Sequence, residues 1–189
     1  MSPAPRRAHQ IIARRLANVL ETACGADLAV ATDVDLRLRD IPLLNRCPDI
    51  VVYDAALHAD AVLRPQHCVL VVEVMSPGSV TTDQTDKPAE YARAGIGHFW
   101  RLEIAGDAVT VFRYRLDPTT HIYASAGSDS TKLVVADPFA VSLDLADLAD
   151  RRETAPRVAA GVITADDHAR SAWWRAAQVV TSPWWRASA

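Results

Sequence analysis

The sequence predicts a mixed α/β domain, with a central mixed sheet flanked by helices and followed by a C-terminal extension. Three observations support this fold class. Apolar residues recur at helical spacing in 9–24, residues 69–75 form a nearly continuous apolar run, and short strand-like segments separated by turn residues fill 98–135. Helices and strands patterned in this way bury their apolar faces against one another in layers.

The composition is that of a globular protein with one core. The chain has 189 residues, of which 50% are hydrophobic and 23% charged, so we expect one domain in residues 1–150 and a tail in residues 151–189. The longest apolar runs are far shorter than the roughly 20 residues of a membrane span. The N-terminus also lacks the apolar segment of a secretory signal. These features predict a cytoplasmic protein that does not bind a membrane.

The first predicted element is an amphipathic helix at residues 9–24. Its apolar residues recur at three- and four-residue steps, and Gly25 follows where a helix end is expected. Residues 28–32 are then predicted to be extended. Residues 34–38 alternate apolar and polar side chains, which is typical of a strand with one buried face. A further strand is predicted at 49–53.

The run at 69–75 predicts a central strand, because it is apolar on both faces. A loop or a short turn of helix at 54–66 precedes it. A second helix is expected from about residue 85 to residue 94. Proline fits the first turn of a helix but disrupts its interior, so Pro88 places the start of this helix nearby and Lys87 in its first turn.

The remainder of the domain is predicted to be a meander of short strands closed by a helix. The turn residues Gly106 and Asp107 separate two of these strands. The closing helix is expected at residues 141–148. The predicted strands cover residues 98–104, 108–116, 121–124 and 132–135.

The tail contains two similar motifs, SAWWRA at 171–176 and SPWWRA at 182–187, which hold four of the five tryptophans. Clusters of tryptophan and arginine suit a partner surface, a stacking site for nucleic acid or a membrane interface. The plainer interpretation is a weakly ordered extension. If the tail were instead the centre of a small interaction protein, deleting residues 151–189 would remove its function.

The net charge of −3 is unevenly distributed along the chain. Residues 1–20 contribute +4 and residues 150–189 contribute +2, which leaves −9 for the middle of the sequence. An acidic middle suits a cation site. The basic N-terminal segment could meet phosphates or form a solvated helix face.

The cysteines and histidines do not form a recognisable metal motif. Cys24, Cys47 and Cys68 lack CxxC spacing and are predicted to be buried free thiols. The six histidines lack the i, i+4 spacing of a helical metal pair. Only the adjacent residues His67 and Cys68 keep a zinc site open as an alternative.

Two carboxylates coincide with the predicted apolar strands. Asp49 begins the strand at 49–53, and Glu73 lies inside the strand at 69–75. A buried carboxylate is costly unless a metal, a cation or a proton relieves its charge. Two carboxylates can hold Mg²⁺, which prefers oxygen ligands and keeps several waters. The backbone carbonyl of Val74 could be a third ligand.

Lys87 follows these carboxylates and would orient or deprotonate a metal-bound water, or neutralise developing charge. Each of the three residues also has a structural interpretation. Asp49 could simply begin a strand and Lys87 could be an exposed helix lysine. Glu73 is harder to explain in this way, because its neighbours in the strand are apolar.

Residues 48–52 (PDIVV), 70–79 (LVVEVMSPGS) and 83–100 (DQTDKPAEYARAGIGHFW) resemble the bacterial putative restriction endonuclease family of the PD-(D/E)XK nuclease superfamily. The resemblance spans roughly residues 9–148. It implies a restriction-endonuclease-like core that hydrolyses DNA phosphodiester bonds with Mg²⁺ or Mn²⁺. By position, it also implies that Asp49, Glu73 and Lys87 are catalytic residues, with the two carboxylates as metal ligands.

The chain departs from the superfamily pattern at one catalytic position. A lysine is expected two residues after the glutamate, where this chain has Met75, so Lys87 must reach the site from the following helix. Glu21 on the first helix could be an accessory acidic residue or could face solvent.

The predicted function is therefore that of a magnesium-dependent endodeoxyribonuclease with DNA as its partner. A homodimer would suit palindromic DNA, and no partner protein can be inferred. The alternative is a catalytically inactive module that keeps the nuclease fold for binding or regulation. Convergence of Asp49, Glu73 and Lys87 on one point would favour the enzyme.

Overall fold

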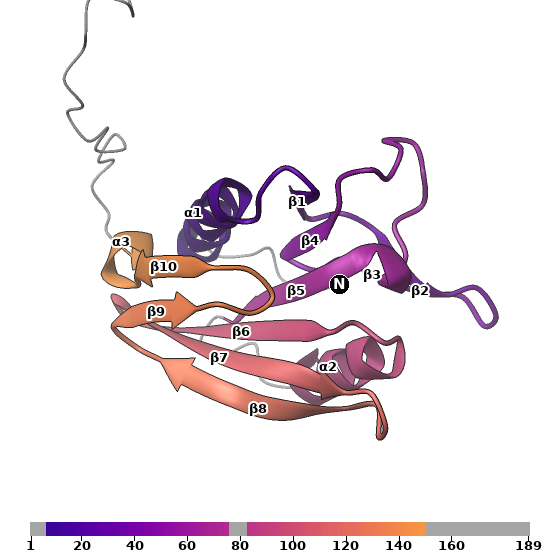
Figure 1. Cartoon of the computed structure of the whole chain (residues 1–189). Helices are drawn as coiled ribbons and strands as arrows, with labels where there is room; N and C mark the ends of the chain where they lie inside the picture. Colours follow the sequence, from indigo (N-terminus) through magenta and orange to yellow (C-terminus); the bar gives the residue numbers. More distant parts are fainter. Residues whose placement is uncertain (1–6, 76–82, 150–189) are drawn as a thin grey trace, which may run out of the picture. The chain divides into compact units, whose positions relative to one another are not determined.

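The computed structural model describes residues 7–75 and 83–149 (Figure 1). The chain divides into two units, Met1–Arg151 and Arg152–Ala189, and every described residue belongs to the first. The predicted tail at 151–189, with its tryptophan motifs, lies outside the described residues, and its role stays a prediction. No helix in the described part of the chain is long and apolar enough to span a membrane.

A six-stranded mixed sheet forms the centre of the first unit. Its strand order is β1-β4-β5-β6-β7-β8, and β5 and β6 are the one parallel pair among these strands. This sheet and its flanking helices confirm the predicted fold class. The strands are β1 (Leu28–Thr32), β4 (Ile50–Asp54), β5 (Cys68–Met75), β6 (His98–Ala105), β7 (Ala108–Asp117) and β8 (Ile122–Asp129).

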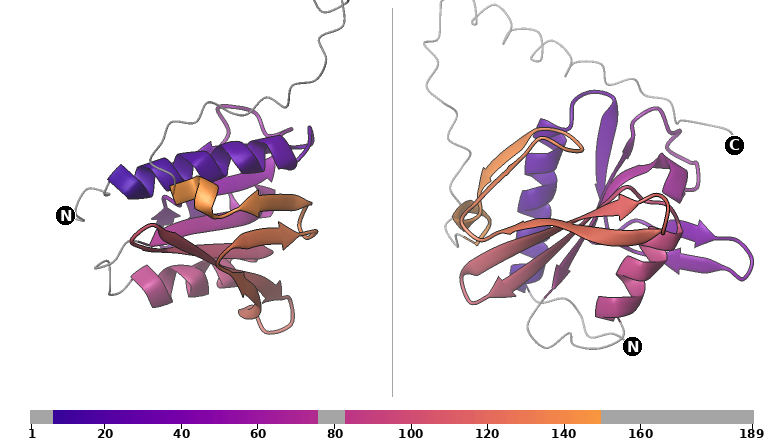
Figure 2. Two further views of the ribbon diagram at one scale, coloured as in Figure 1. Left: turned by 90° about the vertical axis from the view of Figure 1, so that its left-hand side faces the viewer. Right: turned by 60° about the horizontal axis from the view of Figure 1, so that its bottom comes forward.

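Helices cover both faces of this sheet. The views in Figure 2 place α1 (Arg7–Ala23) on one face and α2 (Asp83–Arg93) on the other. Successive side chains of a strand point to opposite faces, so Val72 packs in the core that contains α1. Its neighbour Val71 packs in the second core, which contains Tyr91 of α2. The strand β5 is therefore covered on both faces, as its apolar run predicted.

Two smaller antiparallel sheets complete the unit. The hairpin of β2 (Leu36–Arg39) and β3 (Leu44–Arg46) projects beyond the central sheet (Figure 1). Leu36 is fully buried, and an isolated bridge joins it to Leu63. The other pair, β9 (Lys132–Val135) and β10 (Val141–Asp144), precedes the short helix α3 (Ala146–Ala149).

Arg15 of α1 has a structural role within this fold. Its Nη1 donates hydrogen bonds to the carbonyl oxygens of Asp147 at 3.2 Å and Leu148 at 3.0 Å. Carbonyls near the end of a helix lack intrahelical partners, so this arginine satisfies two such groups in α3. Arg15 therefore joins two helices that pack on the same side of the sheet.

One predicted element requires correction, and one strand was not predicted. Residues 141–148 are not one helix, because Val141–Asp144 form β10 and only Ala146–Ala149 are helical. The side chains of Val141 and Leu143 are buried while their neighbours are exposed, which is the two-residue period of a strand. The short strand β3 was also absent from the prediction, since three residues are too few to show a period.

The helix α2 begins earlier than predicted. It starts at Asp83, so Lys87 lies in its second turn rather than its first, and Pro88 lies inside the helix. Proline has no N–H to donate to the carbonyl four residues earlier, which costs α2 one hydrogen bond near its start. The strand predicted at 121–124 is also longer, because β8 extends to Asp129.

The three cysteines are free, as the sequence predicted. Cys24 and Cys68 are buried as predicted, but Cys47 is exposed, so the prediction of burial was wrong for this thiol. Burial raises the pKa of the Cys68 thiol to about 12, so this side chain is uncharged at neutral pH. A neutral buried thiol packs as a small apolar group rather than as a nucleophile.

Candidate active site

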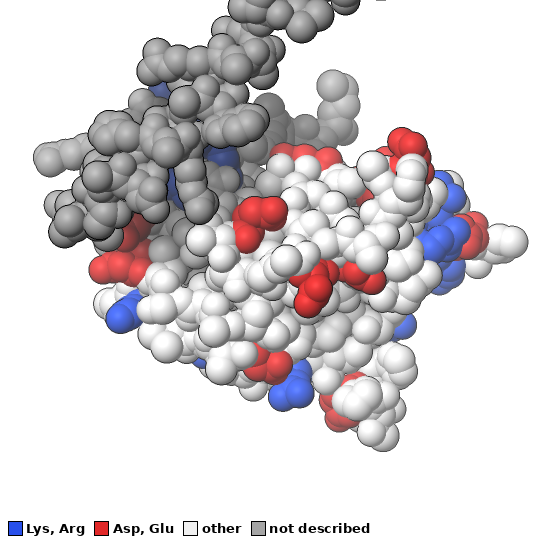
Figure 3. All heavy atoms as spheres, turned by 45° about the horizontal axis from the view of Figure 1, so that its top comes forward, with Lys and Arg blue, Asp and Glu red and all other residues white. Residues whose placement is uncertain are grey.

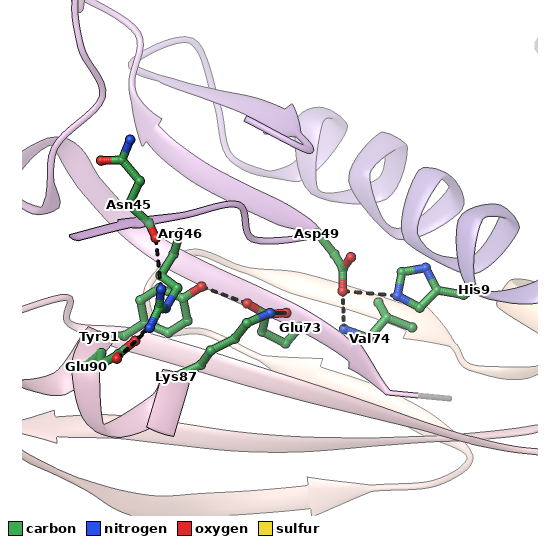
Figure 4. Close-up of polar contacts among 9 residues, drawn as sticks. All are labelled: His9, Asn45, Arg46, Asp49, Glu73, Val74, Lys87, Glu90 and Tyr91. Atoms are coloured by element: carbon green, nitrogen blue, oxygen red, sulfur yellow. Dashed lines mark hydrogen bonds and ion pairs between the residues drawn. The ribbon is translucent and has the colours of Figure 1, made fainter. Parts of the chain in front are cut away.

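His9 and Glu73 are the only polar or charged side chains of the described residues that are buried, with 8% and 6% of their surfaces exposed. His9 lies on α1 and contacts Asp49, and Glu73 lies on β5 and contacts two residues of α2 (Figure 4). Burial of polar groups is costly unless they are paired. Two such groups beside one strand therefore identify this region as the candidate active site.

Glu73 receives two partners from α2. Tyr91 donates its hydroxyl hydrogen to Oε1 of Glu73 at 2.7 Å, and Lys87 Nζ lies 3.2 Å from Oε2. Lys87 and Tyr91 are four residues apart, so they lie on the same face of the helix. One carboxylate thus binds a hydroxyl with one oxygen and an ammonium with the other.

The electrostatic environment moves the titration of Glu73 to neutral pH. Burial raises its pKa to about 7, the charge of Lys87 acts against this shift, and the negative charge of Asp49 adds to it. The pKa of Tyr91 is also raised, first by burial and then by the charge of Glu73. Tyr91 therefore remains a hydrogen-bond donor to the carboxylate.

Asp49 lies next to Glu73 at the start of β4. Ile50 is opposite Val72 in the antiparallel pairing of β4 with β5, which places the preceding residue Asp49 beside Glu73. The Oδ2 atom of Asp49 accepts the backbone N–H of Val74 at 2.7 Å. The same oxygen lies 3.2 Å from Nε2 of His9. The structure therefore brings the three residues predicted to be catalytic into one region.

His9 is a member of this site that the sequence analysis missed. The pKa of its imidazole is raised, mainly by the hydrogen bond to Asp49, while burial opposes the shift. Its second ring nitrogen, Nδ1, has no hydrogen-bond partner among the described residues. One signal was present in the sequence, because His9 lies three and seven residues before Ile12 and Leu16. A polar side chain therefore occupies the apolar face of α1.

Glu21 is not brought to the site. It follows His9 by 12 positions on α1, which corresponds to about 18 Å along a helix. Its Oε2 accepts the backbone N–H of Val30 in β1 at 2.9 Å. Glu21 thus supports the first strand of the sheet, and the accessory role predicted for it receives no support from its position.

Arg46 and Glu90 form a bidentate ion pair beside the site. Arg46 Nε and Nη2 donate to Oε2 and Oε1 of Glu90, each at 2.6 Å (Figure 4). Two parallel bonds of this kind fix both the distance and the orientation of the partners. Because Glu90 follows Lys87 by three residues, this pair ties β3 to the segment of α2 that carries the lysine.

The donor set fits a hard divalent cation. No three His, Cys, Asp or Glu side chains lie close enough to hold a metal by themselves within residues 7–75 and 83–149. Asp49 and Glu73 offer two carboxylates beside the Val74 backbone. Mg²⁺ binds through few carboxylates and keeps waters in its other positions, so this small oxygen set suits it better than zinc.

The fold and the site together define the class of restriction-endonuclease-like proteins. The chain belongs to the family described as "Putative restriction endonuclease" (Uma2), whose model matches residues 1–146. This confirms the resemblance seen in the sequence. No curated protein matches the chain.

A solved structure supports the same fold. The chain is similar to a putative nuclease belonging to DUF820 from Anabaena variabilis, with a TM-score of 0.57. The match covers 79% of this chain and 84% of the other, at 18% sequence identity. At this low identity the likeness establishes the shared fold.

Proposed function

We propose that the protein is a metal-dependent endonuclease that hydrolyses phosphodiester bonds of DNA. The observation that carries the proposal is the buried carboxylate of Glu73, paired with Lys87 and lying beside Asp49. Two neighbouring carboxylates destabilise each other, and such perturbed groups cluster at functional sites. Membership of a family of putative restriction endonucleases supports DNA as the substrate.

Asp49, Glu73 and the backbone carbonyl of Val74 would hold Mg²⁺ or Mn²⁺. When bound, the cation would lower the pKa of a coordinated water and polarise the scissile phosphate. The surrounding residues fix these ligands in place. The Val74 N–H and His9 both contact Oδ2 of Asp49, while Tyr91 binds Oε1 of Glu73.

Lys87 would orient the attacking water or neutralise the charge that develops on the phosphate. The contact between Lys87 and Glu73 supports this role, because it brings a lysine of α2 to the carboxylate, whereas the superfamily pattern has its lysine on the strand. Met75 occupies that strand position in this chain. An ammonium held beside the site acts as a compact positive charge toward phosphate.

The first test is cleavage of supercoiled plasmid and single-stranded DNA by the full chain with Mg²⁺ or Mn²⁺. Glu73→Gln removes the charge but keeps the shape of the side chain, and EDTA removes the metal. Glu103→Gln is the matched control, because Glu103 is an exposed carboxylate on the neighbouring strand β6. We expect cleavage that requires metal and Glu73 but tolerates Glu103→Gln.

Two results would count against this function. Cleavage that survives Glu73→Gln would show that another site or a contaminant is responsible. No cleavage of either DNA by folded protein would favour the alternative of a nuclease-fold module without catalysis, and DNA binding by that protein would then identify a binding function.

A further inference from the structure

The tip of the β2–β3 hairpin exposes large apolar side chains to solvent. Ile41 is 89% exposed and Leu43 is 63% exposed. Val62, another exposed hydrophobic residue, lies next to Leu63, which the bridge to Leu36 ties to β2. Two of the five large hydrophobic side chains that are exposed in the described part of the chain thus lie at the tip of this hairpin, and a third lies near the start of β2.

Arginines surround this apolar tip. Nη1 and Nη2 of Arg64 bind the carboxylate of Asp40 at 2.8 and 3.2 Å, and Nη1 of Arg37 lies 3.8 Å from the same carboxylate. Nε of Arg39 donates to the carbonyl of Pro42 at 3.0 Å, which supports the backbone of the tip. Two guanidinium groups, those of Arg37 and Arg64, therefore share one carboxylate.

This local positive charge contrasts with the acidic middle of the chain. Arg37, Arg39 and Arg64 against Asp40 give a local charge of +2, although residues 21–149 together carry −9. Figure 3 shows a group of Lys and Arg at the right-hand edge of the displayed face, with single ones elsewhere, while Asp and Glu are scattered over the face. A basic arm on an acidic domain attracts a polyanion to that arm.

The hairpin is directly connected to the candidate active site. From Leu43 at its tip, β3 extends about 10 Å to Arg46, at the usual rise of a strand. Arg46 binds Glu90 on α2, one turn after Lys87. Asp49 follows Arg46 by three residues in the chain. A substrate bound at the hairpin would therefore extend toward both Lys87 and Asp49.

We propose that the β2–β3 hairpin is a DNA-contacting arm, in which Ile41 and Leu43 enter a groove of the duplex while Arg37, Arg39 and Arg64 contact phosphates. The inference rests on the proposed function. Apolar side chains that enter the minor groove can wedge between base steps, and flanking arginines neutralise the backbone. A phosphate can take the place of Asp40 between Arg37 and Arg64, since both groups accept bidentate bonds from guanidinium.

The test measures binding without cleavage. A fluorescein-labelled duplex of about 20 base pairs is titrated with the full chain carrying Glu73→Gln in EDTA, and fluorescence anisotropy gives Kd at several salt concentrations. One variant adds Arg37→Gln and Arg39→Gln, and another adds Ile41→Ser and Leu43→Ser. The matched control adds Arg115→Gln and Ile122→Ser, which change an exposed arginine and an exposed isoleucine on β7 and β8.

We expect the arginine variant to raise Kd about tenfold and to reduce the slope of log Kd against log salt by about 1 to 2, as loss of phosphate contacts requires. The apolar variant should raise Kd for duplex and leave the salt slope unchanged. It should also reduce the fluorescence increase of a duplex that contains 2-aminopurine, because unstacking then no longer occurs. The control should match the parent protein.

Three results would overturn the proposal. Unchanged Kd in both hairpin variants would exclude the hairpin from the DNA interface, even if the parent binds and cleaves DNA. Sedimentation velocity that shows a dimer in the parent and a monomer in the apolar variant, with Kd unchanged, would identify a second copy of the chain as the occupant. No DNA binding by the parent would instead remove the proposed function and this inference together.

Discussion

Glu73 and His9 show how a single residue determines the role of its neighbours. Each is a polar group in an apolar position, so each needs partners that the fold must supply from elsewhere in the chain. Tyr91 and Lys87 contact Glu73, and Asp49 contacts His9. The residues that contact Glu73 and His9 are therefore the most informative positions for substitution.

His9→Ala should weaken binding of Mn²⁺ about tenfold, because it removes the group that holds Oδ2 of Asp49 beside the Val74 N–H. His9→Gln should recover part of the affinity, since its amide can donate from nearly the same place. Isothermal titration calorimetry gives both values. Ile12→Ala is the control, because Ile12 is buried on the same helix and its side chain has no group that could donate to Asp49. Equal affinities in His9→Ala and the parent would assign His9 to packing alone.

Tyr91→Phe should lower the free energy of unfolding by about 1–3 kcal/mol at pH 8, because a buried carboxylate loses a donor. The loss should be smaller at pH 5, where Glu73 is protonated. Urea denaturation at both pH values measures this difference. Tyr123→Phe is the matched control, since its hydroxyl donates at 2.8 Å to the carbonyl of Ile96, which does not titrate. A pH-independent loss in Tyr91→Phe would argue against its pairing with an ionised Glu73.

At the scale of secondary structure, α2 presents three polar residues of the site from consecutive turns. Lys87 and Tyr91 bind Glu73 on β5, while Glu90 binds Arg46 on β3. The helix is thus fixed both to the central sheet and to the hairpin. Because Pro88 leaves one hydrogen bond of the helix unmade, these tertiary contacts are needed to hold Lys87 in position.

Arg46→Ala and Glu90→Ala should each lower the free energy of unfolding by about 1–2 kcal/mol, and the double variant should lose little more than either alone. The pair is bidentate and half-buried, so its coupling should exceed that of an exposed ion pair. A double-mutant cycle in urea measures the coupling. The exposed pair of Arg115 and Asp137 provides the comparison. Additive losses at Arg46 and Glu90 would show that the pair does not fix α2.

The sequence was sufficient to predict the elements that are long enough to show a repeating pattern of apolar residues. The helix predicted at 9–24 and the strand predicted at 69–75 correspond to α1 and β5. The strand β3 is too short to show such a pattern. At 141–148, four residues of strand were predicted to be helical. The spacing of apolar residues therefore predicted the elements that have one buried face or two. It failed for elements whose structure depends on pairing with a distant segment of the chain.

The site could be predicted in part for a related reason. Glu73 was identifiable from the sequence because burying a charge inside an apolar strand is costly. This holds whichever part of the chain supplies the partner of that charge. His9 left one signal, a polar side chain on the apolar face of α1, but its pairing with Asp49 depends on how α1 packs at the start of β4, which no local pattern contains. Glu21 was misplaced for the same reason, since both residues lie on one helix and only the packing shows which end meets the site.

At the scale of the whole molecule, the two buried groups make stability depend on pH. The pKa of Glu73 is raised to about 7 and that of His9 is raised above its usual 6.5. Both groups therefore bind protons more tightly in the folded state than in the unfolded state. These two groups therefore make stability fall as pH rises through the window between their unfolded and folded pKa values, and His98, whose pKa is lowered by burial, opposes this in part.

The full chain should accordingly be more stable at pH 5.5 than at pH 8, and Glu73→Gln should reduce that difference. A carboxyl whose pKa shifts from 4.5 to about 7 contributes on the order of 2–3 kcal/mol across this interval. Asp40 and Asp117 do not oppose it there, because their pKa values are lowered and they titrate at more acidic pH. Urea unfolding of parent and variant at both pH values measures the effect.

Mg²⁺ should restore stability to the parent at pH 8 and have little effect on Glu73→Gln. The cation binds the ionised carboxylates of Asp49 and Glu73, and only the folded state brings these two groups together, so binding stabilises the folded state. The same competition between protons and metal predicts that cleavage increases as pH rises through 7, while the metal-free protein becomes less stable. Unfolding in matched Mg²⁺ and EDTA buffers gives the comparison. An equal gain from Mg²⁺ in parent and variant would place the bound cation away from Glu73, and the proposed active site would then have to be abandoned.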